Sequence, residues 1–184
     1  IGGMRLGGAC GDGGTPATPP AGAPPDAGFS AYFALDVTDP EHPVPLWEFS
    51  DTDLGYSTSI PAIVRSGAWD NNGDWYVVFG AGPKVLPKGK ADIGRDRNGY
   101  IYILNLGTGE LVKKVSLSDN AIVGDMLAVD ADRDYLPEKI YFGTAYGGTT
   151  WKGKLMSLDL GRTLATQETD ISWNESFGRV LFND

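Results

Sequence analysis

The sequence predicts an all-β fold, and more narrowly a partial β-propeller made of four-stranded antiparallel blades of the quinoprotein-like type. Three observations carry this prediction. The 184 residues include 26 Gly and 12 Pro, which indicates many turns and little helix. Runs of aromatic and β-branched residues lie between the turn clusters, and no stretch shows helical periodicity of useful length. Finally, a pattern of four strands repeats along the chain.

Strand candidates follow one another closely from residue 29 onward, separated by clusters of Asp, Asn, Gly and Pro. The expected strands are 30–37, 45–49, 58–65, 75–79, 100–106, 111–117, 121–129, 139–144 and 154–160. The tail is less regular, with possible short strands at 171–173 and 180–182.

The internal repeat is marked by three strands that end in Leu, then Asp or Asn, then Val or Leu. The acidic or amide position falls at Asp36, Asn105 and Asp159, so the spacings are 69 residues (105 minus 36) and 54 residues (159 minus 105). Upstream of the last two copies lies a further matching pair of strands, 60–64 before 75–80 and 123–129 before 140–143. Four antiparallel strands repeated at this length are typical of a propeller blade, and a closed propeller needs roughly 4–8 blades. We therefore expect residues 1–184 to be a fragment of one β-propeller domain that holds two to three blades.

Residues 7–28 are almost entirely Gly, Ala, Pro, Asp and Thr, a composition that cannot bury a core. This segment is predicted to be a loop insertion within the propeller domain.

The composition excludes several classes of function. The net charge of −9 disfavours nucleic-acid binding, which needs a cationic surface. No apolar run approaches the ~18 residues of a membrane-spanning helix. The only histidine, His42, lies beside prolines in a turn, and no catalytic triad, nucleophile elbow or phosphate-binding loop can be assembled. We therefore expect a binding protein rather than an enzyme, with no catalytic residues.

The strongest candidate site is a short acidic loop that leads into a strand. Its acidic side chains stand at Asp130, Asp132, Asp134 and Glu138, which are positions 1, 3, 5 and 9. A tight loop with this spacing can surround a hard cation with oxygen ligands, and Ca²⁺ takes roughly 6–8 of them. In this prediction the three aspartates and Glu138 give carboxylate oxygens, and Leu136 gives its backbone carbonyl.

The loop is not a standard EF-hand, which has Gly at position 6 and Glu at position 12. Tyr135 and Tyr141 occupy those positions here. The alternative interpretation is an acidic turn without a ligand. A second polar cluster, Asp70-Asn71-Asn72-Gly73-Asp74, is predicted to be a plain hairpin turn because Asn-Gly is a strong hairpin signal. The pair of carboxylates around Asp36 is predicted to be a turn that ends a strand.

Several segments, in order along the chain, resemble the PilY family of type IV pilus assembly and tip-adhesin proteins. They are Gly3-Met-Arg5-Leu-Gly7-Gly8, Tyr32-Phe-Ala-Leu-Asp36-Val-Thr-Asp-Pro40, Leu46-Trp47-Glu-Phe, Leu54-Gly-Tyr56-Ser-Thr-Ser-Ile-Pro61, Val77-Val-Phe-Gly80 and the acidic loop with Tyr141-Phe-Gly143. The resemblance implies a C-terminal β-propeller domain with a nine-residue calcium loop. The family commonly has Gly where Tyr135 stands and Asp where Glu138 stands.

The resemblance also implies a role in pilus extension, retraction and surface adhesion. Minor pilins of the pilus tip complex and a host or surface receptor would be the partners. The location would be extracytoplasmic, at the cell surface, the pilus tip or the outer-membrane and periplasmic envelope. Two alternatives stay open. The first is a quinoprotein-type propeller dehydrogenase, whose repeats also end in Leu-Asp before a Thr-Gly turn, and the second is a purely structural scaffold.

Overall fold

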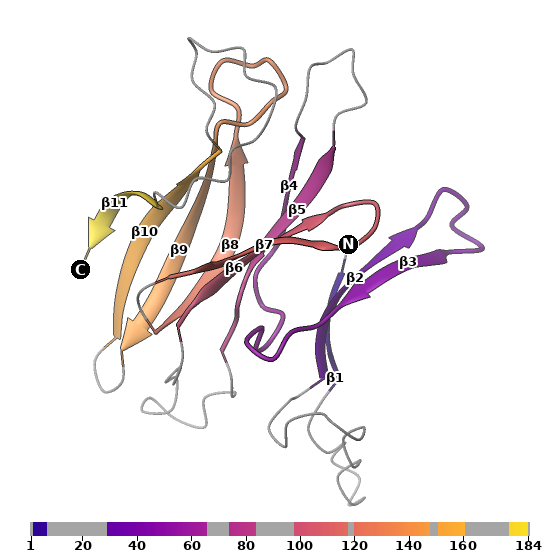
Figure 1. Ribbon diagram of the computed structural model, residues 1–184, viewed down its shortest axis with the longest axis horizontal. Coiled ribbons are helices and arrows are strands. Elements are labelled where there is room, and N and C mark those ends of the chain that lie inside the picture. The colour runs from indigo at the N-terminus through magenta and orange to yellow at the C-terminus, as the bar shows by residue number, and fades with distance from the viewer. Residues whose placement is uncertain are drawn as a thin grey trace, which may run out of the picture.

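The computed structural model is all-β in every part of the chain that it describes, namely residues 2–6, 29–65, 74–83, 98–117, 120–147, 151–160 and 177–183. Within these residues, eleven strands form three separate antiparallel sheets (Figure 1). The strands are β1 (Gly2–Leu6), β2 (Phe29–Asp36), β3 (Val44–Phe49), β4 (Ala62–Arg65), β5 (Trp75–Gly80), β6 (Tyr100–Asn105), β7 (Leu111–Ser116), β8 (Ala121–Val129), β9 (Lys139–Gly147), β10 (Trp151–Asp159) and β11 (Phe177–Asn183).

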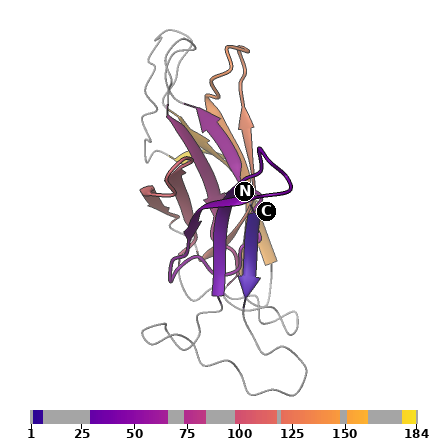
Figure 2. The ribbon, with the colours of Figure 1, turned by 90° about the vertical axis from the view of Figure 1, so that its right-hand side faces the viewer.

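Each sheet is a simple meander in which consecutive strands are neighbours. The first blade has the order β1-β2-β3, the middle blade β4-β5-β6-β7 and the third blade β8-β9-β10-β11. Most of the strands run up or down the long dimension of the view in Figure 2, whereas the β6–β7 hairpin runs obliquely across Figure 1. This arrangement confirms the predicted repeat of four antiparallel strands, with a partial blade before two complete ones, and it is that of a β-propeller.

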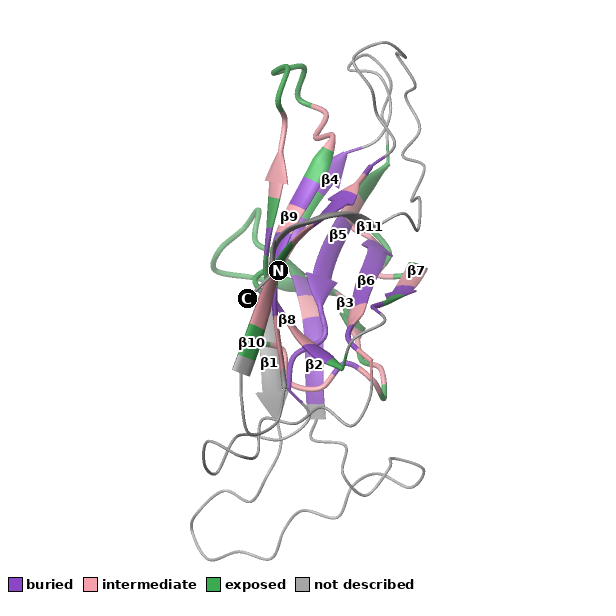
Figure 3. Ribbon diagram, turned by 90° about the vertical axis from the view of Figure 1, so that its left-hand side faces the viewer, coloured by how far each residue is buried: buried purple, intermediate pink, exposed green. Residues whose placement is uncertain are grey.

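The hydrophobic core lies between the blades, in two layers. Tyr32 of the first blade packs with Val77 and Phe79 of the middle blade, whereas Val78 packs with Phe142 and other apolar residues of the third. Adjacent residues of β5 thus pack into different layers of the core, because successive side chains of a strand point to opposite faces of the sheet. The middle blade is therefore buried on both faces, as the buried residues of β5 and β6 show (Figure 3).

The repeated Asp or Asn at the end of the third strand of a blade has a local structural role. Asp36 Oδ1 accepts hydrogen bonds from the Thr38 backbone N–H (2.9 Å) and hydroxyl (2.6 Å). Asn105 Oδ1 accepts from the backbone N–H groups of Gly107 (2.9 Å) and Thr108 (3.1 Å). A short polar side chain at this position satisfies the backbone of the following turn, so the predicted turn at Asp36 is confirmed.

The strand bounds differ from the expected ones by one to three residues at most strands, as at β9 and β10, and by more at three places. The strand β1 was not predicted, and its register places Met4 opposite Ala31 of β2. The strand β4 begins at Ala62 rather than at residue 58, because Ser59 and Ile60 bond to β8 of the third blade instead of extending the sheet. The possible strand at 180–182 falls inside the longer β11.

Three sequence predictions fall wholly or mostly outside the described residues, namely the short strand at 171–173, the loop insertion at 7–28 and the hairpin turn at 70–74. Within the described residues, no helix has the length and apolar character needed to cross a membrane.

Candidate metal centre

The acidic loop is the hairpin between the first two strands of the third blade. It begins after Val129, the last residue of β8, and ends before Lys139, the first residue of β9 (Figure 1). The Glu138 N–H donates to the Val129 carbonyl (3.1 Å), which closes the base of the loop. The Leu160 N–H donates to the Glu138 carbonyl (2.8 Å), so the far end of β10 also holds this base.

The four predicted carboxylates gather in this loop. One oxygen from each of Asp130, Asp132, Asp134 and Glu138 lies within 4.8 Å of the other three. These residues are half-buried or exposed, so solvent can reach the cluster. The sequence spacing alone therefore identified a group of side chains that the fold brings together.

Backbone N–H groups of the loop point inward at the carboxylates. Asp130 Oδ1 accepts from Arg133 N (2.6 Å) and Asp134 N (3.2 Å), and its Oδ2 accepts from Tyr135 N (2.8 Å). Glu138 Oε2 accepts from Ala131 N (2.8 Å) at the opposite end. These bonds hold the loop wound around its own acidic side chains.

Two residues of the loop adopt a left-handed backbone conformation, Arg133 with φ of 67° and Tyr135 with φ of 69°. This conformation costs a residue other than Gly roughly 1–2 kcal/mol. Tyr135 makes this turn despite its Cβ, and the absence of Gly at position 6 of the loop does not prevent the loop from winding.

The donor set of the loop suits a hard cation. All four side chains offer carboxylate oxygens, the ligands that Ca²⁺ prefers, at oxygen distances of about 2.3–2.6 Å. Two ligands on opposite sides of such an ion stand about 4.6–5.2 Å apart, and the mutual separation of up to 4.8 Å fits this range. Asp132 and Asp134 each use one carboxylate oxygen in hydrogen bonds, to Asp134 N (3.2 Å) and Leu136 N (2.8 Å), so each has a second oxygen to offer. The loop could hold a metal ion.

The remaining predicted ligand is the backbone carbonyl of Leu136. This residue lies in the same loop, where its N–H is bonded to Asp134 Oδ1, and ligation by its carbonyl stays a prediction. The corresponding hairpin of the middle blade, which joins β4 to β5, contains Asn71, Asn72 and Gly73, and these residues lie outside the described part of the chain.

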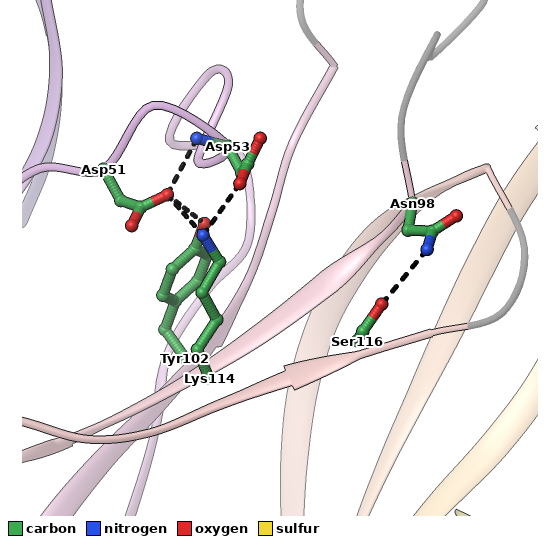
Figure 4. A network of polar contacts seen from close by, with 6 residues as sticks. All are labelled: Asp51, Asp53, Asn98, Tyr102, Lys114 and Ser116. Carbon is green, nitrogen blue, oxygen red and sulfur yellow. Dashed lines mark hydrogen bonds and ion pairs between the residues drawn. The ribbon is translucent and has the colours of Figure 1, made fainter.

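A second charged cluster, which the sequence analysis missed, joins the connector from β3 to β4 (residues 50–61) to the edge strand β7. Lys114 Nζ lies 2.8 Å from Asp51 Oδ1 and 2.8 Å from Asp53 Oδ2 (Figure 4). Asp51 Oδ1 also accepts from the Tyr102 hydroxyl (2.9 Å) and the Asp53 N–H (2.7 Å). The ammonium lies over the Tyr100 ring, 4.5 Å from its centroid. No sequence signal indicated this cluster, because Lys114 lies 63 residues from Asp51 and 61 residues from Asp53 in the chain.

The cluster shifts the pKa values of Asp51 and Lys114 toward the charged forms. Partial burial by itself would raise the pKa of Asp51, but hydrogen bonds from Lys114, the Asp53 N–H and Tyr102 hold it below its usual value. Burial would likewise lower the pKa of Lys114, and the bonds to Asp51 and Asp53 raise it instead. The cluster is thus a satisfied ion pair that links the connector to the middle blade.

Comparison with known proteins places the chain in one family. No family model matches the sequence. A type IV pilus biogenesis factor PilY1 homologue from Xylella fastidiosa (strain Temecula1) is 31% identical over 175 residues, or 84% of this chain. The type IV pilus biogenesis factor PilY1 of Pseudomonas aeruginosa (strain PAO1) is 31% identical over 138 residues, or 71% of this chain. The chain spans only 10% and 11%, respectively, of the length of these relatives.

A solved structure supports the same assignment. The crystal structure of the Pseudomonas aeruginosa PilY1 C-terminal domain matches 70% of this chain and 24% of its own, with 27% sequence identity and a TM-score of 0.53. Sequence and fold agree, and the chain belongs to the PilY1 family of type IV pilus biogenesis factors.

Proposed function

We propose that this chain is a calcium-binding β-propeller segment of a type IV pilus biogenesis and tip-adhesin protein. The observation that carries the proposal is the gathering of four loop carboxylates within 4.8 Å of one another. A cation would neutralise the mutual repulsion of these groups, and the inward N–H groups of the loop already hold the side chains near a common centre. The ligands would be Asp130, Asp132, Asp134, Glu138 and the carbonyl of Leu136.

The proposed role of calcium is to order the loop and fasten the β8–β9 hairpin. Ion binding would fix the carboxylates in one arrangement and so favour the closed form of the hairpin over open forms. Extracellular calcium modules bind at about 10⁻⁴–10⁻³ M, a range that suits a sensor outside the cytoplasm. In the family context the ordered loop would support pilus extension against retraction and surface adhesion, with minor pilins of the tip complex and a surface receptor as partners.

The names of the relatives favour assembly or binding over catalysis, because both are described as pilus biogenesis factors. The alternative of a quinone-dependent dehydrogenase has no observation among the described residues that favours it. An absorption spectrum of the purified protein would test it directly, since a bound quinone absorbs visible or near-ultraviolet light. The proposed location is extracytoplasmic, at the pilus tip or in the cell envelope.

Isothermal titration calorimetry with Ca²⁺ tests the site. We expect the unmodified chain to bind one ion, and Asp132→Ala to weaken binding at least tenfold because it removes one of the clustered carboxylates. Glu48→Ala is the matched control, since it removes an exposed carboxylate from β3 in another blade. Equal calcium binding by the unmodified chain and Asp132→Ala would refute the assignment of the site, whereas an equal loss in Glu48→Ala would indicate a nonspecific charge effect.

A further inference from the structure

Strand β8, which leads into the acidic loop, carries a β-bulge. Its register against β9 pairs Val123 with Thr144 and then Met126 with Phe142, so β8 has one residue more than β9 between these pairs. The extra residue lies at Gly124–Asp125. Because side chains alternate along a strand, an extra residue exchanges the two faces for every position that follows it. The bulge therefore decides which side chains face the middle blade just before the loop begins.

Hydrogen bonds from the connector hold the bulge. Ser59 Oγ donates to the Gly124 carbonyl (2.7 Å), and the Ile60 N–H donates to Asp125 Oδ1 (2.9 Å). The Met126 N–H in turn donates to the Ile60 carbonyl (3.0 Å). Three successive residues of β8, Gly124 to Met126, are thus bonded to Ser59 and Ile60 of the connector. These bonds fix the bulge in place.

Ser59 joins this contact to the rest of the molecule. Its side chain is buried, and its hydroxyl also accepts from the Gly80 N–H (3.1 Å). Its carbonyl accepts from the Tyr32 hydroxyl (2.7 Å) of the first blade. The residue that holds the bulge is therefore fixed by all three blades, and it cannot shift without disturbing the packing between them.

After the bulge, β8 is short and leads directly to the first ligand of the loop. Met126 and Ala128 contact the core between the middle and third blades, whereas Leu127 is 64% exposed. A strand that lost the bulge would turn Leu127 inward and Met126 outward, and Asp130 would leave β8 on the opposite face. The position of the bulge thus sets the direction from which Asp130 enters the cluster.

From this arrangement we infer that Asp125 is a positioning residue for the acidic loop, and that docking of the third blade on the connector is coupled to metal binding. The second part rests on the proposed function. Coupling of this kind is reciprocal, so that calcium in the loop strengthens the docking by the same factor by which docking strengthens calcium binding. Asp125 acts through its acceptor oxygen and not as a ligand.

The variants Asp125→Ala and Asp125→Asn distinguish the effect of the hydrogen-bond acceptor at residue 125 from the effect of its negative charge. Asparagine keeps the Oδ1 acceptor for the Ile60 N–H, and alanine removes it. In a calcium titration of the 184-residue chain, Asp125→Ala should bind calcium at least about fivefold more weakly than the unmodified chain does. A factor of about five is the lower end of typical coupling between sites. Asp125→Asn should stay within twofold of the unmodified chain. Equal affinity of all three proteins would overturn the coupling.

Amide hydrogen exchange without calcium gives a second measurement that does not depend on the metal. In Asp125→Ala the loop amides of Ala131, Arg133 and Tyr135 should exchange several-fold faster, with rescue in Asp125→Asn. The Gly109 amide, bonded to the Asn105 carbonyl in the middle blade (2.9 Å), should not change. Unchanged loop amides, or an equal acceleration at Gly109 from general destabilisation, would refute the positioning role.

The two proposals fail in different ways. If the unmodified chain binds no calcium, the proposed function fails, and the exchange of the loop amides still decides whether Asp125 positions the loop. If the chain binds calcium and Asp125→Ala binds it equally well, the site stands and the coupling is wrong.

Discussion

The replacement of Lys114 by Met should weaken the attachment of the connector to the middle blade. The side chains of Lys114, Asp51 and Asp53 are 25%, 22% and 26% exposed, so the pair is intermediate between a surface and a buried ion pair. Hydrogen bonds to charged groups contribute roughly 1.5–3 kcal/mol each, and exposed pairs only about 0.2–1 kcal/mol. With two such contacts of 2.8 Å and partial screening, we expect the free energy of unfolding to fall by about 2 kcal/mol.

The loss should depend on pH in a defined way. The folded-state pKa of Asp51 is below its unfolded value, so its contribution is present above about pH 4 and is lost as pH falls through the folded pKa. The folded-state pKa of Lys114 is above its unfolded value, so its contribution is present below about pH 10 and is lost as pH rises through the folded pKa. The difference between the unmodified chain and Lys114→Met should therefore be largest between about pH 5 and pH 9 and should shrink outside that window.

Urea unfolding followed by tryptophan fluorescence measures this difference, and a double-mutant cycle with Asp51→Asn isolates the pair. We expect a coupling free energy of about 1 kcal/mol, between the values for exposed and buried pairs. Lys152→Met is the control, because Lys152 is exposed on β10 and outside the cluster. A coupling below about 0.3 kcal/mol at pH 7, which is within the usual additivity of independent sites, would refute the view that this pair fastens the connector.

Three further predictions concern other contacts. Tyr32→Phe should lower the free energy of unfolding by about 1–2 kcal/mol, because it leaves the carbonyl of buried Ser59 without the bond at 2.7 Å; an unchanged denaturation midpoint would contradict this. Gly80→Ala should cost about 1–3 kcal/mol by overpacking, since an added Cβ would lie 2.3 Å from Val123 Cγ1 and 2.4 Å from Val123 Cβ; an unchanged midpoint in thermal unfolding would rule this out. Tyr135→Gly should relieve the left-handed strain at φ of 69° and strengthen calcium binding by up to about tenfold, which corresponds to about 1.4 kcal/mol; weaker binding in calorimetry would show that the tyrosine side chain itself supports the loop.

The sequence determined the features of this protein that depend on residues close together in the chain. The alternation of apolar strands and turn residues predicted nine strands that the structure contains, and the repeat ending at Asp36, Asn105 and Asp159 predicted the four-stranded blades. The reason is that the repeated Asp or Asn satisfies the backbone of its own turn, as Asp36 does for Thr38. The four clustered carboxylates were predictable for the same reason, because a nine-residue loop brings its own side chains together.

Contacts between blades could be decided only by the tertiary structure, because their partners are distant in the chain and follow no spacing rule. Ser59 bonds to Gly124 across 65 positions, and Lys114 to Asp51 across 63. No sequence pattern indicated that β4 would start only at Ala62 or that Asp125 would lie in a bulge, since both depend on where a neighbouring blade presents its N–H and carbonyl groups. Interactions between residues close together in the chain thus determine the strands of each blade and the acidic loop. The packing of one blade on the next determines the orientation of the loop and the contacts that hold it in place.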